Sequence, residues 1–422
     1  MLHNMKTGSR AIILWSVVSL LMVLHFFLLL SVGIITTELR DALSLTALEL
    51  SFLSSSYLYI YIILQTPAGI LLDEFGARKI LTVGSLVCSL GCWLFAHSAD
   101  LNAAIVARVL MGGGLAFVFI SSIQLAGRWF DQRFLGLMIG LSEAAGMVGA
   151  IVGSMLLAIF MDKIGWRESF GLAAIMALIL SGLTWLFVHD YPNPSRVVAA
   201  RNKLSVQKVW INLRIIMREP LLWLHSFYMA LMYVSITVFS GLWANPFLRR
   251  AFDLSLDQST FACCLVLTGI GIGSPMAGIL CQTMPSRIRC ILVCAVSMLI
   301  CMMMLLYVPQ LSYSAINFLM FALGVSGSSL ILSFAIVSNL APEGAKSTSV
   351  GFSNMLSLVT AILFQPVIGW FLNLLSDEIG ADGLEYYSAT HYRIALTVLP
   401  VLISAALVLA VIIARKSKQI KA

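Results

Sequence analysis

His25, Arg108 and Glu143 are ionisable side chains that lie inside long apolar stretches of this sequence. A charged side chain at the centre of a bilayer costs roughly 2.5–3.5 kcal/mol on insertion scales, so it is expected to face a protein interior and to have a partner. A guanidinium group in such a place is suited to bind an anion, and a carboxyl or imidazole group is suited to take up and release a proton. We therefore predict that Arg108 and His25 bind a ligand and that Glu143 and His25 carry protons.

Each of these assignments has a structural alternative. Arg108 lies near one end of its apolar stretch, from which its long side chain could reach the membrane surface. Glu143 could form a hydrogen bond across an interface of small residues, because Gly140, Gly146 and Gly149 surround it in the sequence. The two residues are expected at different depths, so a direct ion pair between them is not expected.

Further polar side chains occur at positions that are otherwise apolar. Three tyrosines, Tyr57, Tyr59 and Tyr61, alternate along one stretch, so they cannot all face the same side of a helix. His225 and Tyr228 lie near the end of another stretch, where aromatic residues often mark the membrane surface. The remaining candidate ligand-binding residues are Tyr57, Tyr61, Tyr233, Asn317 and Asn354.

The elements that must position these residues are membrane-spanning helices. The 422 residues are 60% hydrophobic and 11% charged, which leaves too little polar surface for soluble domains of this size. Apolar stretches of about 20 residues or more recur, and each is long enough to cross a bilayer as a helix. The twelve predicted spans are 11–35, 47–72, 80–97, 102–126, 135–160, 168–188, 220–245, 259–281, 290–308, 313–338, 348–374 and 394–414.

The charged residues indicate an orientation. With twelve spans, 19 of the 26 Lys and Arg residues lie on the side of the N-terminus, six lie on the other side, and Arg108 lies within a span. The positive-inside rule therefore places both termini in the cytoplasm. Because the basic residues are spread over short loops that face one leaflet, the net charge of +7 does not indicate a nucleic-acid partner.

The chain divides into two halves of six spans each. The predicted domains are an N-terminal bundle (residues 1–188), a basic cytoplasmic linker (189–219) and a C-terminal bundle (220–422). The tetrapeptide AGIL at 68–71 recurs at 277–280, at equivalent places after the second and eighth spans. Such an internal repeat is typical of secondary transporters.

The string GILLDEFGARK at residues 69–79 carries the most specific signal. A glycine at 69 allows close helix packing, Asp73 can accept hydrogen bonds from a helix end, and Gly76 permits a tight turn. Arg78 and Lys79 keep the loop on the cytoplasmic side. The string resembles the signature between spans 2 and 3 of the major facilitator superfamily (MFS), except that the family usually has a basic residue at the position of Glu74.

This resemblance implies an all-α membrane protein of twelve helices in two pseudo-symmetric six-helix bundles. It implies a secondary transporter that works by alternating access, in which Gly69, Asp73, Gly76, Arg78 and Lys79 form a gating motif. An arginine in the fourth span followed by small residues is similar to residues that the family uses for proton coupling or anion binding. We expect a proton-coupled symporter of a small anionic or zwitterionic solute, such as a carboxylate, amino acid or peptide. An exporter of drugs or siderophore-like compounds and a sensor that does not transport are the alternatives.

Other classes of function are disfavoured. Each pair of nearby cysteines, such as Cys88 and Cys92, lacks a His or carboxylate neighbour, so no metal or other cofactor is expected. The sequence has no phosphate-binding loop and no nucleophile elbow, so neither a pump nor an enzyme is expected. The predicted partners are a small-molecule substrate, protons and the lipid bilayer, and the predicted form is a monomer in a bacterial inner membrane.

Overall fold

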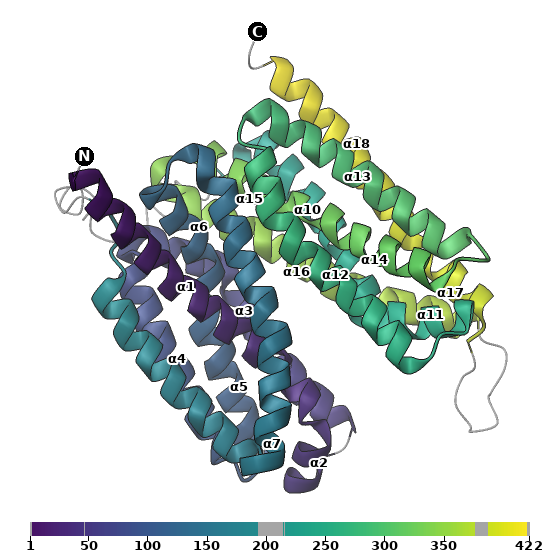
Figure 1. The fold of residues 1–422 in the computed structure, drawn as a ribbon, viewed down its shortest axis with the longest axis horizontal. Coiled ribbons are helices and arrows are strands. Elements are labelled where there is room, and N and C mark those ends of the chain that lie inside the picture. The colour runs from purple at the N-terminus through teal and green to yellow at the C-terminus, as the bar shows by residue number, and fades with distance from the viewer. Residues whose placement is uncertain (1, 46, 193–213, 215, 376–386, 420–422) are drawn as a thin grey trace. The chain divides into compact units, whose positions relative to one another are not determined.

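The computed structural model describes all residues except 1, 46, 193–213, 215, 376–386 and 420–422. The described residues form helices and no strands (Figure 1). The α-helices are α1 (Leu2–Ile34), α2 (Thr36–Leu43), α3 (Ala47–Phe75), α4 (Ala77–Ala96), α5 (Leu101–Leu115), α6 (Val118–Trp129), α7 (Leu135–Phe187), α10 (Pro220–Val238), α11 (Ala244–Phe252), α12 (Leu256–Leu280), α13 (Met284–Tyr307), α14 (Tyr313–Gly327), α15 (Ser329–Leu340), α16 (Lys346–Leu375), α17 (Ala389–Leu396) and α18 (Val398–Gln419).

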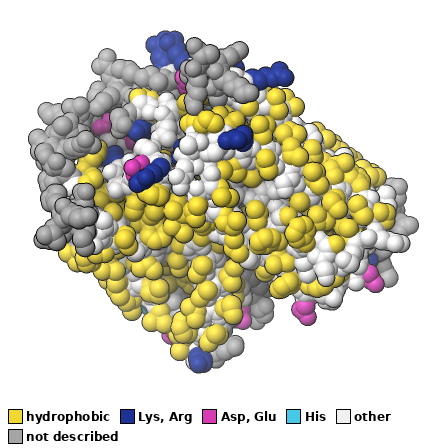
Figure 2. Space-filling model, turned by 45° about the horizontal axis from the view of Figure 1, so that its top comes forward, with side chains coloured by type: hydrophobic (Ala, Val, Ile, Leu, Met, Phe, Trp, Pro, Cys, Tyr) yellow, Lys and Arg dark blue, Asp and Glu magenta, His cyan; other side chains and the backbone are white. Residues whose placement is uncertain are grey.

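Twelve of the described helical segments are long and apolar enough to cross a membrane, which confirms the predicted fold class. In Figure 2, hydrophobic side chains make up most of the surface in view, and charged side chains lie mainly toward its margins. Large apolar side chains that face outward, such as Leu280 and Val293, would have no favourable environment in water. The protein is therefore a multi-pass membrane protein.

The contacts between residues divide the chain into two compact units. The first consists of Met1–Arg218 together with Ala341–Phe352, and the second consists of Glu219–Leu340 together with Ser353–Ala422. The sequence assigns residues 341–352 to the C-terminal half, but this segment, which includes the start of α16, packs with the first unit. Most of the predicted linker (189–219) and the acidic residues near 377–385 lie outside the described residues.

In the first unit, α1 packs along α7, and α5 packs between α3 and α4 (Figure 1). These helices pack closely because glycine residues leave room for the neighbouring backbone. A Cβ atom on Gly112 of α5 would collide with the carbonyl oxygen of Tyr57 on α3, and one on Gly149 of α7 would collide with the backbone of Val23 on α1. Small residues therefore let α1, α3, α5 and α7 approach closely enough for their polar side chains to meet.

Several spans are interrupted. The two predicted spans between residues 135 and 188 form the single long element α7, with a break at Gly165, where φ is +85°. The fourth span breaks between α5 and α6, and the tenth breaks between α14 and α15 at Ser328. In the seventh span a π-helical turn (Phe239–Trp243) precedes Pro246, whose ring nitrogen cannot donate to the helix.

Candidate functional site

The structure brings four of the predicted site residues together within the first unit. His25 of α1, Tyr57 and Tyr61 of α3, and Arg108 of α5 are all buried. His25 Nδ1 and the Tyr57 hydroxyl are 2.7 Å apart, and the imidazole stacks on the Tyr61 ring with centroids 4.8 Å apart. The guanidinium carbon of Arg108 lies 4.8 Å from the centroid of the Tyr57 ring. We call these four residues the buried polar cluster.

Arg108 is held by neutral groups. Its Nη1 donates to the carbonyl oxygen of Leu28 at 2.7 Å, and its Nη2 donates to that of Ser54 at 3.4 Å. The Nε atom is buried and has no hydrogen-bond acceptor among the described residues. No carboxylate of the described residues forms an ion pair with Arg108. With a side chain that is 0% exposed, Arg108 does not reach the membrane surface, so that alternative is wrong.

The three alternating tyrosines behave as their spacing predicts. Tyr57 and Tyr61 are buried inside the first unit, whereas Tyr59 is 48% exposed. The Tyr59 phenol faces outward from α3, so it cannot bind a ligand that Tyr57 and Tyr61 contact. Only Tyr57 and Tyr61 therefore belong to the buried polar cluster.

Glu143 lies apart from this cluster on α7 and is half-buried. It has no hydrogen bond or ion pair to any described residue, Arg108 included. The neighbouring Ser142 accepts a hydrogen bond from Trp15 Nε1 of α1 at 2.9 Å. Glu143 is thus a carboxyl group in a helix interface without a neutralising partner, as a reversible proton carrier requires.

The second unit has its own buried polar residues. Among the predicted ligand-binding residues, Tyr233 and Asn317 are half-buried and Asn354 is buried, and the Oδ1 atom of Asn317 has no donor. His225 and Tyr228 are 1% and 0% exposed, so the interpretation of these two as residues of the membrane surface is wrong. Tyr228 donates to Ser329 Oγ at 2.8 Å, which ties α10 to α15.

The carboxylate of Asp73 caps the first turn of α16. Its Oδ1 accepts from the backbone nitrogen of Ser347 at 3.1 Å, and its Oδ2 accepts from the backbone nitrogen and the hydroxyl of Thr348 at 2.9 and 2.7 Å. A negative charge at a helix N-terminus is favourable because the free N–H groups and the helix dipole face it. Gly69 allows this approach, since a Cβ atom there would collide with Ser347 and Thr348.

Gln124 of α6 is a further member of this contact, which the sequence did not identify. Its Nε2 atom donates to Ser347 Oγ at 2.6 Å and to Asp73 Oδ1 at 3.3 Å. A glutamine inside an apolar helix is a weak signal by itself. Only its contact with Asp73, about 50 positions away in the chain, gives it a role.

We predict that Asp73→Asn lowers the free energy of unfolding by about 1–3 kcal/mol, because an amide nitrogen would then face backbone N–H donors in a buried place. The measurement is the thermal midpoint of the purified protein in detergent. Asp131→Asn is the matched control, since Asp131 caps a 3₁₀ turn (Gln132–Phe134) at an exposed position, where asparagine caps equally well. Equal midpoints for the two variants would contradict the assigned role of Asp73.

The turn between α3 and α4 is fixed by Asp190, another residue that the sequence did not connect to the motif. Gly76 has φ of +82°, and the carboxylate of Asp190 lies 2.5–2.6 Å from the place of a Cβ atom. Asp190 Oδ1 accepts from the backbone nitrogen of Arg78 at 3.2 Å, and Asp190 lies 3.9 Å from Arg128 Nη1. The Arg78 guanidinium donates to the carbonyl of Trp185, at the end of α7, at 2.7 and 2.9 Å.

Lys79, the last residue of the predicted gating motif, is exposed, and no hydrogen bond or ion pair joins it to a described residue. The Arg78 guanidinium binds a backbone carbonyl, that of Trp185. The two basic residues therefore differ, because Arg78 ties two helix ends together and Lys79 faces outward.

We predict that Gly76→Ala destabilises the protein by about 1–2 kcal/mol, because alanine tolerates a positive φ poorly and its methyl group would meet Asp190. Gly182→Ala is the control: Gly182 lies within α7 with open space around it, so alanine there should be neutral or slightly stabilising. Thermal unfolding followed by tryptophan fluorescence measures both. A Gly76→Ala protein as stable as the control would exclude the inferred strain.

Comparison with known proteins assigns the family. A model described as "Major Facilitator Superfamily" matches residues 14–381. The chain belongs to this superfamily. The solved structure of the MFS proton:xylose symporter XylE, bound to 6-bromo-6-deoxy-D-glucose, superposes with a TM-score of 0.68 over 94% of this chain and 95% of the symporter, at 13% identity. That similarity shows the shared MFS fold.

Two relatives from Escherichia coli K12 are similar in sequence. A probable L-galactonate transporter is 26% identical over 242 residues, which cover 54% of this MFS chain and 52% of the relative. The probable galactarate/D-glucarate transporter GudP is 22% identical over 401 residues, which cover 86% of this chain and 87% of GudP. The chain spans about half the length of several curated relatives, with shares of 40–60%.

The described residues hold no group of three or more His, Cys, Asp or Glu side chains that could bind a metal ion. Cys290 and Cys294 have sulfur atoms 3.9 Å apart, but they do not belong to such a group among the described residues.

Proposed function

We propose that the protein is a secondary active transporter that moves a small organic anion across a bacterial inner membrane by alternating access, with protons as the coupling ion. The observation that carries this proposal is Arg108, a fully buried guanidinium group whose partners are neutral carbonyls. A buried cation of this kind lacks charge neutralisation, which an anionic ligand would supply.

The substrate class that we favour is the sugar acids. The relatives described above bear the names of transporters of L-galactonate and of galactarate or D-glucarate, which are carboxylates with several hydroxyl groups. Arg108 is suited to the carboxylate, because a guanidinium group can donate two parallel hydrogen bonds. His25, Tyr57 and Tyr61 supply groups that can bind hydroxyls. Tyr233, Asn317 and Asn354 remain our further candidates for ligand binding.

Glu143 is our candidate for the proton carrier, with His25 as the second candidate. Glu143 has no cation among the described residues to keep it ionised, so it can exchange a proton as its surroundings change. Gly69, Asp73, Gly76, Arg78 and Lys79 are our candidate gating motif, because Asp73 holds a helix end through bonds that must break if that end moves. The distribution of Lys and Arg supports our proposal that both termini lie in the cytoplasm.

The test is uptake into proteoliposomes under an inward proton gradient. We expect labelled L-galactonate or D-glucarate to accumulate, and a neutral pentose such as xylose to be excluded, because it carries no charge for Arg108. Equal accumulation of the neutral sugar, or no accumulation of any sugar acid, would overturn the proposed substrate class. Binding of a sugar acid without flux would instead identify a sensor.

A further inference from the structure

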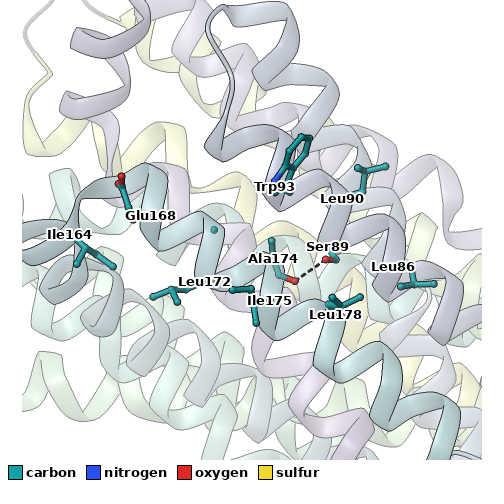
Figure 3. A pocket seen from close by; sticks show the side chains of 11 residues that line it. Leu86, Ser89, Leu90, Trp93, Ile164, Glu168, Leu172, Ala174, Ile175 and Leu178 are labelled. Carbon is teal, nitrogen blue, oxygen red and sulfur yellow. Dashed lines mark hydrogen bonds between the residues drawn. The ribbon is translucent and has the colours of Figure 1, made fainter.

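A groove on the outer surface of the first unit is not used by the proposed transport function. It has a volume of about 700 Å³ and runs between α4 and the second half of α7 (Figure 3). Leu86, Leu90 and Trp93 of α4 line one side, and Leu172, Ile175 and Leu178 of α7 line the other. The groove is in the size range of sites that bind small molecules, which is roughly 300–1,000 Å³.

The floor of the groove is closed. Ser89 Oγ donates to the carbonyl oxygen of Ala174 at 2.8 Å, so the two helices touch there, and the polar groups of the floor are satisfied (Figure 3). Gly171 leaves the groove open, since a Cβ atom at this position would meet nothing within 4 Å. The walls are exposed to the membrane, with Trp93 50% and Ile175 55% exposed. The occupant must therefore be apolar over most of its length.

One end of the groove is charged. Glu168 lines this end, is exposed, and has no ion pair among the described residues. Lys163 precedes Glu168 in the chain, on the other side of the break at Gly165, is exposed, and has no ion pair among the described residues. Arg167, in contrast, already has hydrogen-bond partners: its Nη1 donates to the carbonyls of Ala96 and Ser98 at 3.0 and 2.8 Å.

The same end has the features of a membrane surface. The ring of Trp93 lies against that of His97, just before α4 ends, with centroids 4.6 Å apart and ring planes tilted by 33°. Tryptophan is enriched where the hydrocarbon meets the lipid headgroups. Glu168 and Lys163 therefore lie at the level of the headgroups, and the apolar walls of the groove lie at the level of the acyl chains.

We propose that this groove is a specific site for one phospholipid with a primary amine in its headgroup, of the phosphatidylethanolamine type. One acyl chain occupies the groove between α4 and α7. The headgroup ammonium binds the carboxylate of Glu168, and the phosphate lies near Lys163. A zwitterionic headgroup matches this pair of opposite charges, whereas an anionic headgroup without an amine leaves Glu168 unpaired.

The experiment measures lipids retained by the full-length protein, by native mass spectrometry after exchange into mixed micelles of phosphatidylethanolamine and phosphatidylcholine. We expect the wild type to retain one phosphatidylethanolamine. Gly171→Leu fills the groove and should reduce this binding about tenfold, the loss expected when about two methylene groups lose their buried place. Gly182→Leu is the matched control, because it adds the same side chain to an open surface of the same helix and should retain the lipid.

The charged end is tested separately. Glu168→Gln should lower the preference for phosphatidylethanolamine over phosphatidylcholine about threefold, as for an exposed ion pair, without preventing binding of the acyl chain. Equal retention by the Gly171→Leu and Gly182→Leu proteins would overturn the groove as the site. Equal retention of the two lipids by the wild type would overturn the headgroup assignment, and dimers that Gly171→Leu abolishes would show a second copy in the groove instead.

A second measurement does not depend on Gly171→Leu. Phospholipids with brominated acyl chains quench tryptophan on contact, and Trp93→Phe identifies the contribution of the groove. We expect brominated phosphatidylethanolamine to quench Trp93 more than brominated phosphatidylcholine does. The same Trp93 quenching by both lipids would contradict a specific site, and neither result depends on whether the protein transports sugar acids.

Discussion

Arg108→Ala is expected to abolish binding and transport of the sugar acid, with a loss of affinity of at least about 100-fold. This corresponds to about 3 kcal/mol, which is typical when one member of a buried, hydrogen-bonded charge pair is removed. Arg108→Lys should recover little, because a compact ammonium group lacks the planar fork that reaches the carbonyls of Leu28 and Ser54 and also offers two parallel donors to a carboxylate. The measurement is equilibrium binding of a labelled sugar acid to the detergent-purified protein.

Arg167→Ala is the control for Arg108→Ala. Arg167 also lies in a helix, donates to two backbone carbonyls and stacks on an aromatic ring, that of Trp166, at 4.3 Å. Its loss should therefore change stability in a similar way, but it should leave affinity for the anion unaltered, because Arg167 lies outside the buried polar cluster. A folded Arg108→Ala protein that binds the sugar acid normally would reduce Arg108 to a structural role.

The class of the fold is readable in the sequence because it depends on local properties. A helix that crosses a bilayer needs an apolar stretch of a certain length, and this requirement can be checked one stretch at a time. The loop motif is equally local, since the residues from Gly69 to Lys79 are nearly contiguous. The break of α7 at Gly165 is harder to predict from the sequence, because a glycine within an apolar stretch does not by itself indicate where a helix is interrupted.

The contacts within the site could not be predicted in the same way. The sequence selected His25, Tyr57, Tyr61 and Arg108 by type, but the hydrogen bond from His25 to Tyr57 joins positions 32 residues apart, and that from Arg108 to Leu28 joins positions 80 apart. Such pairs depend on how helices pack, and the close approach at Gly112 decides where Arg108 lies. A single sequence contains the glycine but does not say which helix approaches it.

The partners of the loop motif were missed for a related reason. Asp190 is one acid at the end of a span, and nothing local distinguishes it from other acids next to a predicted linker. Its contacts with Arg78 and Arg128 arise because the start of α4 and the ends of α6 and α7 lie on the same side of the first unit. The common location of these helix termini could have indicated such a contact. Gly76 would have supported it, because the lack of a side chain there leaves room for a neighbouring group.

Glu143→Gln is expected to abolish accumulation of the sugar acid against its gradient, while exchange of labelled for unlabelled substrate across the membrane continues. Glutamine has nearly the shape of a protonated glutamate, so the variant resembles a carrier that is permanently loaded with its proton. It can complete the exchange of substrate, which needs no proton release, but it cannot couple transport to the proton gradient. We therefore expect at least about a 100-fold fall in the accumulation ratio, with an exchange rate within about threefold of the wild type.

Glu74→Gln is the matched control, because Glu74 is also a half-buried carboxyl group of the first unit without an ion pair among the described residues. It lies at the end of α3, away from the interface of α7 with α1, so its neutralisation should leave coupling unchanged. Both variants are compared in proteoliposomes with an imposed proton gradient and then with equal pH on the two sides. If Glu143→Gln still accumulates substrate, the proton must be carried elsewhere, and His25, buried next to Tyr57, becomes the group to replace.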